Sequence, residues 1–215
     1  MPKPTFRQRA RTGAEPVARV VGRLGVSPNA LTLIGFIFAV AAAVFAGAEM
    51  WLAAALLVAV GAAFDMLDGA LARATNRLTR LGAFLDSTFD RAGEAVVYIG
   101  IAVAYARSDT PEMAVVPMAA MATAFMVSYT RAKSESLGFT PGSGMANVGF
   151  APREVRVVIL AVGLLLTHLG GGLGRLPWPE QGAWWLAVTL GLITILATAT
   201  TIQRIVHVII QARKE

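Results

Sequence analysis

The sequence FDMLDGALARATNRLTRLGAFLDSTFD, residues 64–90, contains four of the five aspartates of the chain. Asp65 and Asp68 are three residues apart, and Asp86 and Asp90 are four residues apart. On a helix, each of these spacings places both carboxylates on one face. The connection between the two pairs is short. The stretch therefore predicts two antiparallel neighbouring helices whose acidic faces meet.

The rest of the chain is apolar. Of its 215 residues, 56% are hydrophobic and only 15% are charged, whereas a soluble domain has about 25% charged residues. Roughly 20 apolar residues cross a bilayer as a helix, which satisfies its own backbone hydrogen bonds there. Five long runs contain no Asp, Glu, Lys or Arg: 24–48, 50–64, 113–130, 157–174 and 181–203. These runs predict an all-α integral membrane protein.

Six transmembrane helices can be placed along the chain. The third is the least apolar, because acidic and basic residues occupy its first half. We expect residues 26–215 to form one six-helix membrane domain, and residues 1–25 to form a cytoplasmic segment with a short juxtamembrane amphipathic helix over 16–25. The expected spans are about 28–47, 51–73, 83–106, 113–135, 153–170 and 181–208.

The distribution of basic residues predicts the orientation. All of the 19 Lys and Arg residues except Arg107 and Arg175 fall on one side of these spans. The positive-inside rule then places both termini and the acidic cluster on the cytoplasmic side of the cell membrane, with multiple passes. The four tryptophans fall near the opposite interface. A basic membrane face attracts anionic headgroups and phosphorylated substrates, and gives no indication of nucleic acid.

Four converging carboxylates repel one another strongly, so something positive must compensate them. Without His or Cys nearby, oxygen ligands suit Mg²⁺ or Mn²⁺, and two ions are the economical answer. The alternative is a solvated helix end that pairs with neighbouring arginines. Ionisable residues in spans are usually functional, which favours the metal. Small residues one turn from the aspartates would keep this face open: Gly69, Ala72, Gly82 and Gly93.

The acidic stretch also resembles a known family. The order Asp65-x2-Asp68-Gly69-x2-Ala72-Arg73-x8-Gly82-x3-Asp86-x3-Asp90 matches all eight positions of the signature of the CDP-alcohol phosphotransferases. Three segments are similar to the phosphatidylinositol phosphate synthases within that family: FDMLDGALAR at 64–73, VSPNALTLIG at 26–35 and SYTRAKSESLG at 128–138.

This resemblance implies a reaction in which a hydroxyl of the acceptor attacks the β-phosphorus of CDP-diacylglycerol and CMP leaves. It implies that Asp65, Asp68 and Asp86 bind metal, and that Asp90 both binds metal and acts as the general base. A homodimer is implied as well. The residues that resemble CDP-lipid ligands are Asn29, Ala30, Leu31, Thr32, Gly69, Arg73 and Thr79. For Asn29, a role as the N-cap of the helix after Pro28 is an equal alternative to binding the CDP-lipid.

The acceptor is predicted to be inositol 1-phosphate, giving phosphatidylinositol phosphate. Pro152 departs from the expected pattern, so glycerol 3-phosphate, serine or another alcohol phosphate remains open. A divalent-cation transporter is a further alternative, but it would place charges at the bilayer midplane. Five basic residues form the candidate pocket for the acceptor phosphate, although each also fits ordinary positive-inside charge: Arg131, Lys133, Arg153, Arg156 and Arg204.

Overall fold

The computed structural model describes residues 25–139, 148–173 and 181–213, together with Pro16, Val20 and Gly22. The described parts of the chain are helical and contain no strand. The expected amphipathic helix over 16–25 falls almost wholly outside the described residues. The helices are α2 (Pro28–Gly47), α3 (Trp51–Ala74), α4 (Arg80–Ala106), the short 3₁₀ helix η1 (Pro111–Ala114), α5 (Val115–Ser136), α6 (Arg153–Leu169) and α7 (Gln181–Ala212).

Each of the six predicted spans corresponds to one α-helix. Four helical segments are long and apolar enough to cross a membrane: Pro28–Gly47, Trp51–Ala74, Pro111–Ser136 and Trp184–Ala212. The other two helices differ for separate reasons. The first half of α4 carries several charged residues, and α6 has only 17 residues. Length and composition therefore support a membrane protein in which four helical segments are apolar enough to span the bilayer.

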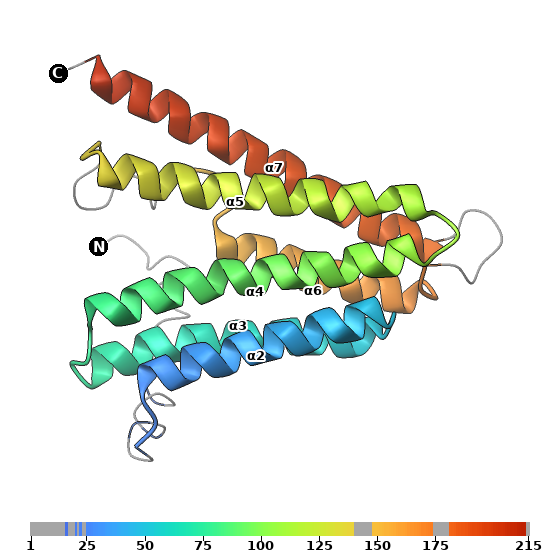
Figure 1. Ribbon diagram of the computed structural model, residues 1–215, viewed down its shortest axis with the longest axis horizontal. Coiled ribbons are helices and arrows are strands. Elements are labelled where there is room, and N and C mark those ends of the chain that lie inside the picture. The colour runs from blue at the N-terminus through green and yellow to red at the C-terminus, as the bar shows by residue number, and fades with distance from the viewer. Residues whose placement is uncertain are drawn as a thin grey trace, which may run out of the picture.

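The helices lie side by side along one direction (Figure 1). The starts of α2 and α4 and the ends of α3, α5 and α7 lie at the same end of the bundle, whereas α6 begins further inside (Figure 1). Helix α2 packs against both α3 and α4, α6 packs against α3 and α7, and α5 packs against α4 and α7.

The prediction that α3 and α4 are direct neighbours is wrong. These helices make few direct contacts. A cavity of about 40 Å³ lies among α2, α3, α4 and α6, and residues of all four helices line it. Helix α2 packs against both α3 and α4, and the cavity between them is lined by apolar side chains together with the charged side chains of Asp65, Glu94 and Arg153.

Two glycines of the bundle allow close approaches that a side chain would prevent. A Cβ atom on Gly100 of α4 would lie 2.2 Å from the carbonyl oxygen of Ala43 in α2. A Cβ atom on Gly35 of α2 would lie 2.6 Å from Oδ1 of Asp65. The first glycine brings the backbones of α2 and α4 together, and the second leaves room for a carboxylate of the acidic cluster.

Side-chain caps fix the starts of α2 and α4. Ser27 Oγ accepts a hydrogen bond from the backbone N–H of Ala30 at 3.2 Å, and Pro28 occupies the first helical turn. Thr79 Oγ1 accepts from the N–H of Gly82 at 2.9 Å. Both arrangements are favoured at helix starts. The interpretation of Asn29 as the N-cap is therefore wrong, because Ser27 fills that position.

Candidate active site

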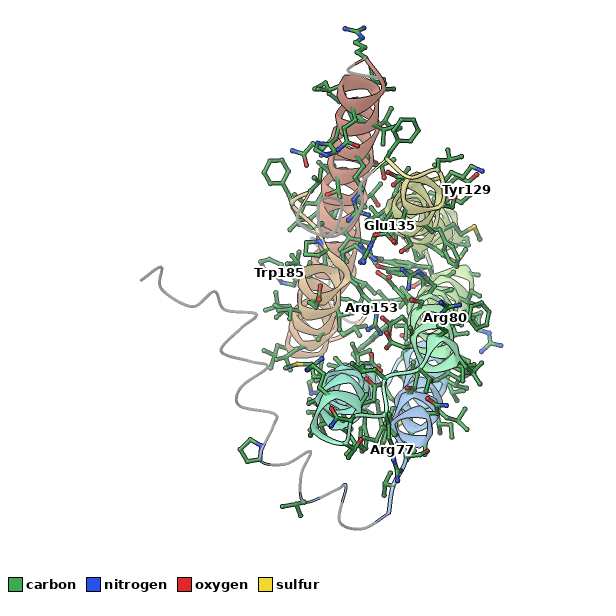
Figure 2. The ribbon with its side chains drawn as sticks, turned by 90° about the vertical axis from the view of Figure 1, so that its left-hand side faces the viewer. Arg77, Arg80, Tyr129, Glu135, Arg153 and Trp185 are labelled. Carbon is green, nitrogen blue, oxygen red and sulfur yellow. The ribbon has the colours of Figure 1, made fainter. Side chains whose placement is uncertain are left out.

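Arg153 joins the two acid pairs that the sequence singled out. Its Nη2 lies 2.6 Å from Oδ2 of Asp65 in α3, and its Nη1 lies 2.7 Å from Oδ1 of Asp90 in α4. Arg153 is the first residue of α6. Viewed from the end where α3 ends and α4 begins, it lies in the middle of the bundle (Figure 2). The acidic faces of α3 and α4 thus meet through one guanidinium group.

The other two aspartates belong to the same cluster. Asp68 is buried, and its Oδ2 accepts a hydrogen bond from the hydroxyl of Thr32 at 2.6 Å. Asp86 lies within electrostatic range of Asp65, Asp68 and Arg153. Four carboxylates in a restricted space repel one another, and the charges of Arg153 and Arg91 offset only part of this repulsion.

The oxygen-rich cluster has the chemistry that a hard divalent cation prefers. In the parts of the chain that the structure describes, no three Asp, Glu, His or Cys side chains are grouped closely enough to hold a metal ion. The guanidinium of Arg153 stands between Asp65 and Asp90. The donor set fits Mg²⁺ or Mn²⁺, and a cation that is shared by α3 and α4 would require Arg153 to move aside.

Several residues predicted to bind the CDP-lipid gather where α2 and α4 begin. A Cβ atom on Gly82 would lie 3.0 Å from Oγ1 of Thr79 and 3.2 Å from Oδ1 of Asn29, so these two side chains meet at Gly82. Thr79 and Asn29 are both exposed. Both side chains thus lie at the surface of the described part of the bundle.

The remaining residues of this set differ in exposure. Leu31 is buried in a small apolar cluster with Ala70 and Leu71, while Ala30 is half-buried. The packing of Leu31 favours a structural role for its side chain. Gly69 is half-buried and Arg73 is exposed. A Cβ atom on Gly69 would lie 3.3 Å from Nη1 of Arg73, so this glycine leaves space for the guanidinium.

The five basic residues predicted to bind the acceptor do not all lie at the acidic cluster. Arg153 contacts it. Arg131 forms an exposed ion pair with Glu135 at 2.8 Å, and Lys133 is exposed. Arg204 donates hydrogen bonds to the carbonyl oxygens of Val148, at 3.1 Å, and of Val127. The contacts of Arg204 favour a structural role over direct binding of a phosphate.

Arg156 forms a buried ion pair that the sequence did not predict. Its Nε lies 2.8 Å from Oε1 of Glu94 and its Nη2 lies 2.7 Å from Oε2. Its Nη1 donates to the carbonyl oxygen of Ala151 at 2.9 Å, and the hydroxyl of Tyr98 donates to Glu94 at 3.2 Å. These contacts favour a structural role for Arg156 as well.

One signal in the sequence pointed to Glu94. It is an acidic residue inside an expected span, four residues after Asp90 and thus on the same helical face. Ionisable residues at such positions are usually paired. The partner carries no local signal, because Arg156 is 62 residues away.

Comparisons with known proteins agree with the acidic signature. A family model described as CDP-alcohol phosphatidyltransferase matches residues 25–202. The archaetidylinositol phosphate synthase of Pyrococcus horikoshii is 33% identical over 203 residues, which cover 93% of each chain. The phosphatidylinositol phosphate synthase of Mycolicibacterium smegmatis is 34% identical over 186 residues, which cover 85% of this chain and 80% of that protein.

Solved structures similar to this chain include those of a phosphatidylinositol phosphate synthase. The crystal structure of Mycobacterium tuberculosis phosphatidylinositol phosphate synthase with CDP-DAG bound has a TM-score of 0.74 and 31% identity, and the match covers 91% of this chain and 92% of that chain. The structure of the same enzyme in complex with manganese and citrate has a TM-score of 0.74 and 30% identity, with 91% and 88% covered. Because the family model covers most of the chain and relatives above 30% identity match over most of its length, the protein belongs to the CDP-alcohol phosphatidyltransferase family.

Proposed function

We propose that the protein transfers the phosphatidyl group from CDP-diacylglycerol to inositol 1-phosphate, which gives phosphatidylinositol phosphate and CMP. The observation that carries the proposal is the gathering of Asp65 and Asp90 around Arg153, which places acidic and basic groups at one point between α3, α4 and α6. Relatives from both bacteria and archaea are named for inositol phosphate lipids, which supports this acceptor.

The cation-binding residues in this proposal are Asp65, Asp68, Asp86 and Asp90. A relative was crystallised with manganese, which supports a divalent cation, and four carboxylates suit two ions, either Mg²⁺ or Mn²⁺. When bound, the cations would polarise the pyrophosphate of the CDP-lipid and stabilise charge on departing CMP.

Asp90 is the proposed general base. It accepts the proton of the attacking inositol hydroxyl while the new bond forms between that oxygen and the β-phosphorus. The bond between the β-phosphorus and the oxygen of CMP breaks in the same displacement. Arg153, which contacts Asp90, is well placed to hold the phosphate of the acceptor beside this base.

The nucleotide end of the donor is proposed to lie where α2 and α4 begin. Asn29 and Thr79 meet there, and Thr32 contacts Asp68 of the acidic cluster. Arg73 supplies a guanidinium for a phosphate. Ala30 and Leu31 complete this set through their backbone, and Gly69 through its small size.

Arg131 and Lys133 remain candidates for the acceptor phosphate, together with Arg153.

We further propose that all six helices cross the membrane, with both termini and the active site on the cytoplasmic side, and that the protein is a homodimer. The basic residues near one end of the bundle support this orientation. Two acidic residues in the first half of α4, Asp90 and Glu94, then face the bundle interior, where each forms an ion pair with an arginine of α6.

A second donor is also supported. Two of the relatives are named archaetidylinositol phosphate synthases, so the transferred group can be archaetidyl in place of phosphatidyl. The acidic cluster would act on the shared pyrophosphate in the same way, because the two donors differ in their lipid chains.

The test is release of CMP from the purified protein in detergent with Mg²⁺. CDP-diacylglycerol and its archaeal counterpart would each be offered with inositol 1-phosphate, free inositol, glycerol 3-phosphate, serine or water. Inositol 1-phosphate should give the fastest release. If it gave no more CMP than water did, the proposed acceptor would be wrong. Faster release with glycerol 3-phosphate or serine would move the protein to a sister reaction.

A further inference from the structure

Two ion pairs join α4 to α6 one helical turn apart. We call Arg153–Asp90 the outer pair and Arg156–Glu94 the inner pair. The acidic partners are four residues apart on α4 and the arginines are three residues apart on α6, so each set lies on one helical face. The side chains of the outer pair are 26% and 18% exposed, whereas those of the inner pair are 1% and 6% exposed.

The inner pair also fixes the backbone just before Arg153. Through Nη1, Arg156 holds the carbonyl oxygen of Ala151, two residues before Arg153. Thr200 of α7 accepts hydrogen bonds from the N–H groups of Phe150 and Ala151, both at 3.1 Å. The start of α6 is therefore attached to α4 through Glu94 and to α7 through Thr200.

The guanidinium of Arg153 has few other restraints. Its Nε is buried and has no hydrogen-bond partner among the described residues. Its terminal nitrogens bind carboxylate oxygens of Asp65 and Asp90. A cation at the acidic cluster would need these same oxygens as ligands. Arg153 and a divalent cation thus compete for the same carboxylates, and how firmly Arg153 is held determines the strength of that competition.

From these contacts we infer that Glu94 and Arg156 are positioning residues, which act on the cation site through Arg153. The inner pair keeps the start of α6 at the depth from which Arg153 reaches both carboxylates. If this pair is loosened, Arg153 competes less well and the acidic cluster binds divalent cations more tightly. This inference rests on one part of the proposed function, the binding of a cation by the acidic cluster, and does not depend on the identity of the substrates.

The experiment measures binding of Mn²⁺ to the full-length protein in detergent by electron paramagnetic resonance, without CDP-lipid or acceptor. Arg153→Gln should tighten Mn²⁺ binding by about tenfold or more, the scale measured for close charge pairs. Arg91→Gln is the matched control for loss of one positive charge. Arg91 follows Asp90 directly on α4 and its Nη1 donates to the carbonyl oxygen of Ser87, so its loss should change the affinity less.

Arg156→Lys then tests the inner pair. It keeps the charge but loses the fork that binds both oxygens of Glu94. Mn²⁺ affinity should rise several-fold in the otherwise native protein and stay unchanged when Arg153→Gln is already present. A merely structural role would lower the unfolding temperature in both backgrounds without this dependence on Arg153. Tyr98→Phe, which removes only one hydrogen bond to Glu94, is the milder variant should Arg156→Lys fail to fold, with a smaller rise expected.

Three results would overturn the inference. The first is an equal change in Mn²⁺ affinity from Arg156→Lys, or from the milder Tyr98→Phe, with and without Arg153→Gln. The second is a change in Mn²⁺ affinity from Arg91→Gln as large as that from Arg153→Gln. The third is no Mn²⁺ binding by either the native protein or Arg153→Gln. Binding by Arg153→Gln alone would support it. Release of CMP is assayed separately on the same preparations. A failure to use inositol 1-phosphate would overturn the proposed function while leaving the Mn²⁺ result standing.

Discussion

The outer and inner pairs join the same two helices through the same kinds of side chain, yet their surroundings differ. The inner pair is almost fully buried, and Tyr98 and the carbonyl of Ala151 satisfy its remaining polar atoms. The outer pair is partly exposed, and Arg153 shares its charge with Asp65. A fully satisfied buried pair resists exchange, since separating it leaves an uncompensated charge in an apolar environment. A partly exposed and shared arginine can change partners at a much lower free energy cost.

The largest effect should follow from breaking the outer pair on its acidic side. Asp90→Asn removes the proposed general base, so release of CMP should fall by about 100- to 10,000-fold. The unfolding temperature should change little, because Arg153 keeps Asp65 as a partner. Both quantities can be measured on one detergent preparation, by CMP release and by thermal unfolding. Activity close to that of the native protein would remove Asp90 from the reaction.

Breaking the inner pair should act on stability first. Glu94→Leu leaves Arg156 buried without its carboxylate, which should cost about 3–5 kcal/mol in the free energy of unfolding. Thermal or denaturant unfolding in detergent would show the loss. The matched control is Glu94→Leu combined with Arg156→Leu, which should recover most of the stability because no charge is left unpaired. If Glu94→Leu were as stable as the native protein, the inner pair would not be structural.

A hydrogen bond within the acidic cluster gives an intermediate case. Thr32→Val removes the hydroxyl that donates to Asp68, and a hydrogen bond to a charged group contributes about 1.5–3 kcal/mol. We expect a loss of stability in this range and weaker binding of the CDP-lipid. Thr32→Ser keeps the hydroxyl and should behave like the native protein. Equal effects of the two substitutions would show that the methyl group matters and the hydrogen bond does not.

The smallest effect on stability should come from the exposed ion pair between Arg131 and Glu135. The side chains of Arg131 and Glu135 are 41% and 45% exposed, and such pairs one helical turn apart contribute about 0.3–0.5 kcal/mol. Arg131→Gln should therefore leave the unfolding temperature nearly unchanged. A rise in the KM for inositol 1-phosphate at unchanged stability would support a place for Arg131 in the acceptor site. An unchanged KM would exclude it from that site.

The sequence was sufficient to predict the helices and the acidic cluster. Runs of apolar residues and the spacing of Asp65, Asp68, Asp86 and Asp90 are local properties, and a helix converts them directly into lengths and faces. Family membership followed from the same residues, and the comparisons confirm it.

The sequence could not predict the contacts between distant segments. The distance between α3 and α4 depends on how α2 and α6 pack against them. The reach of Arg153 depends on where α6 begins, and Thr200 of α7 helps to set that point. Arg156 and Arg204 carry the same charge as Arg153, but burial and carbonyl partners give them different roles. These differences appear only once the chain is folded.

The recessed start of α6 has an electrostatic consequence of its own. The aligned peptide dipoles of a helix give its first turn a partial positive charge. Helix α6 begins inside the bundle (Figure 1), and its first residue, Arg153, contacts Asp65 and Asp90. This partial charge therefore lies about one arginine side chain away from the carboxylates. The peptide backbone itself thus offsets part of the negative potential there, and substitution of a side chain cannot abolish that contribution.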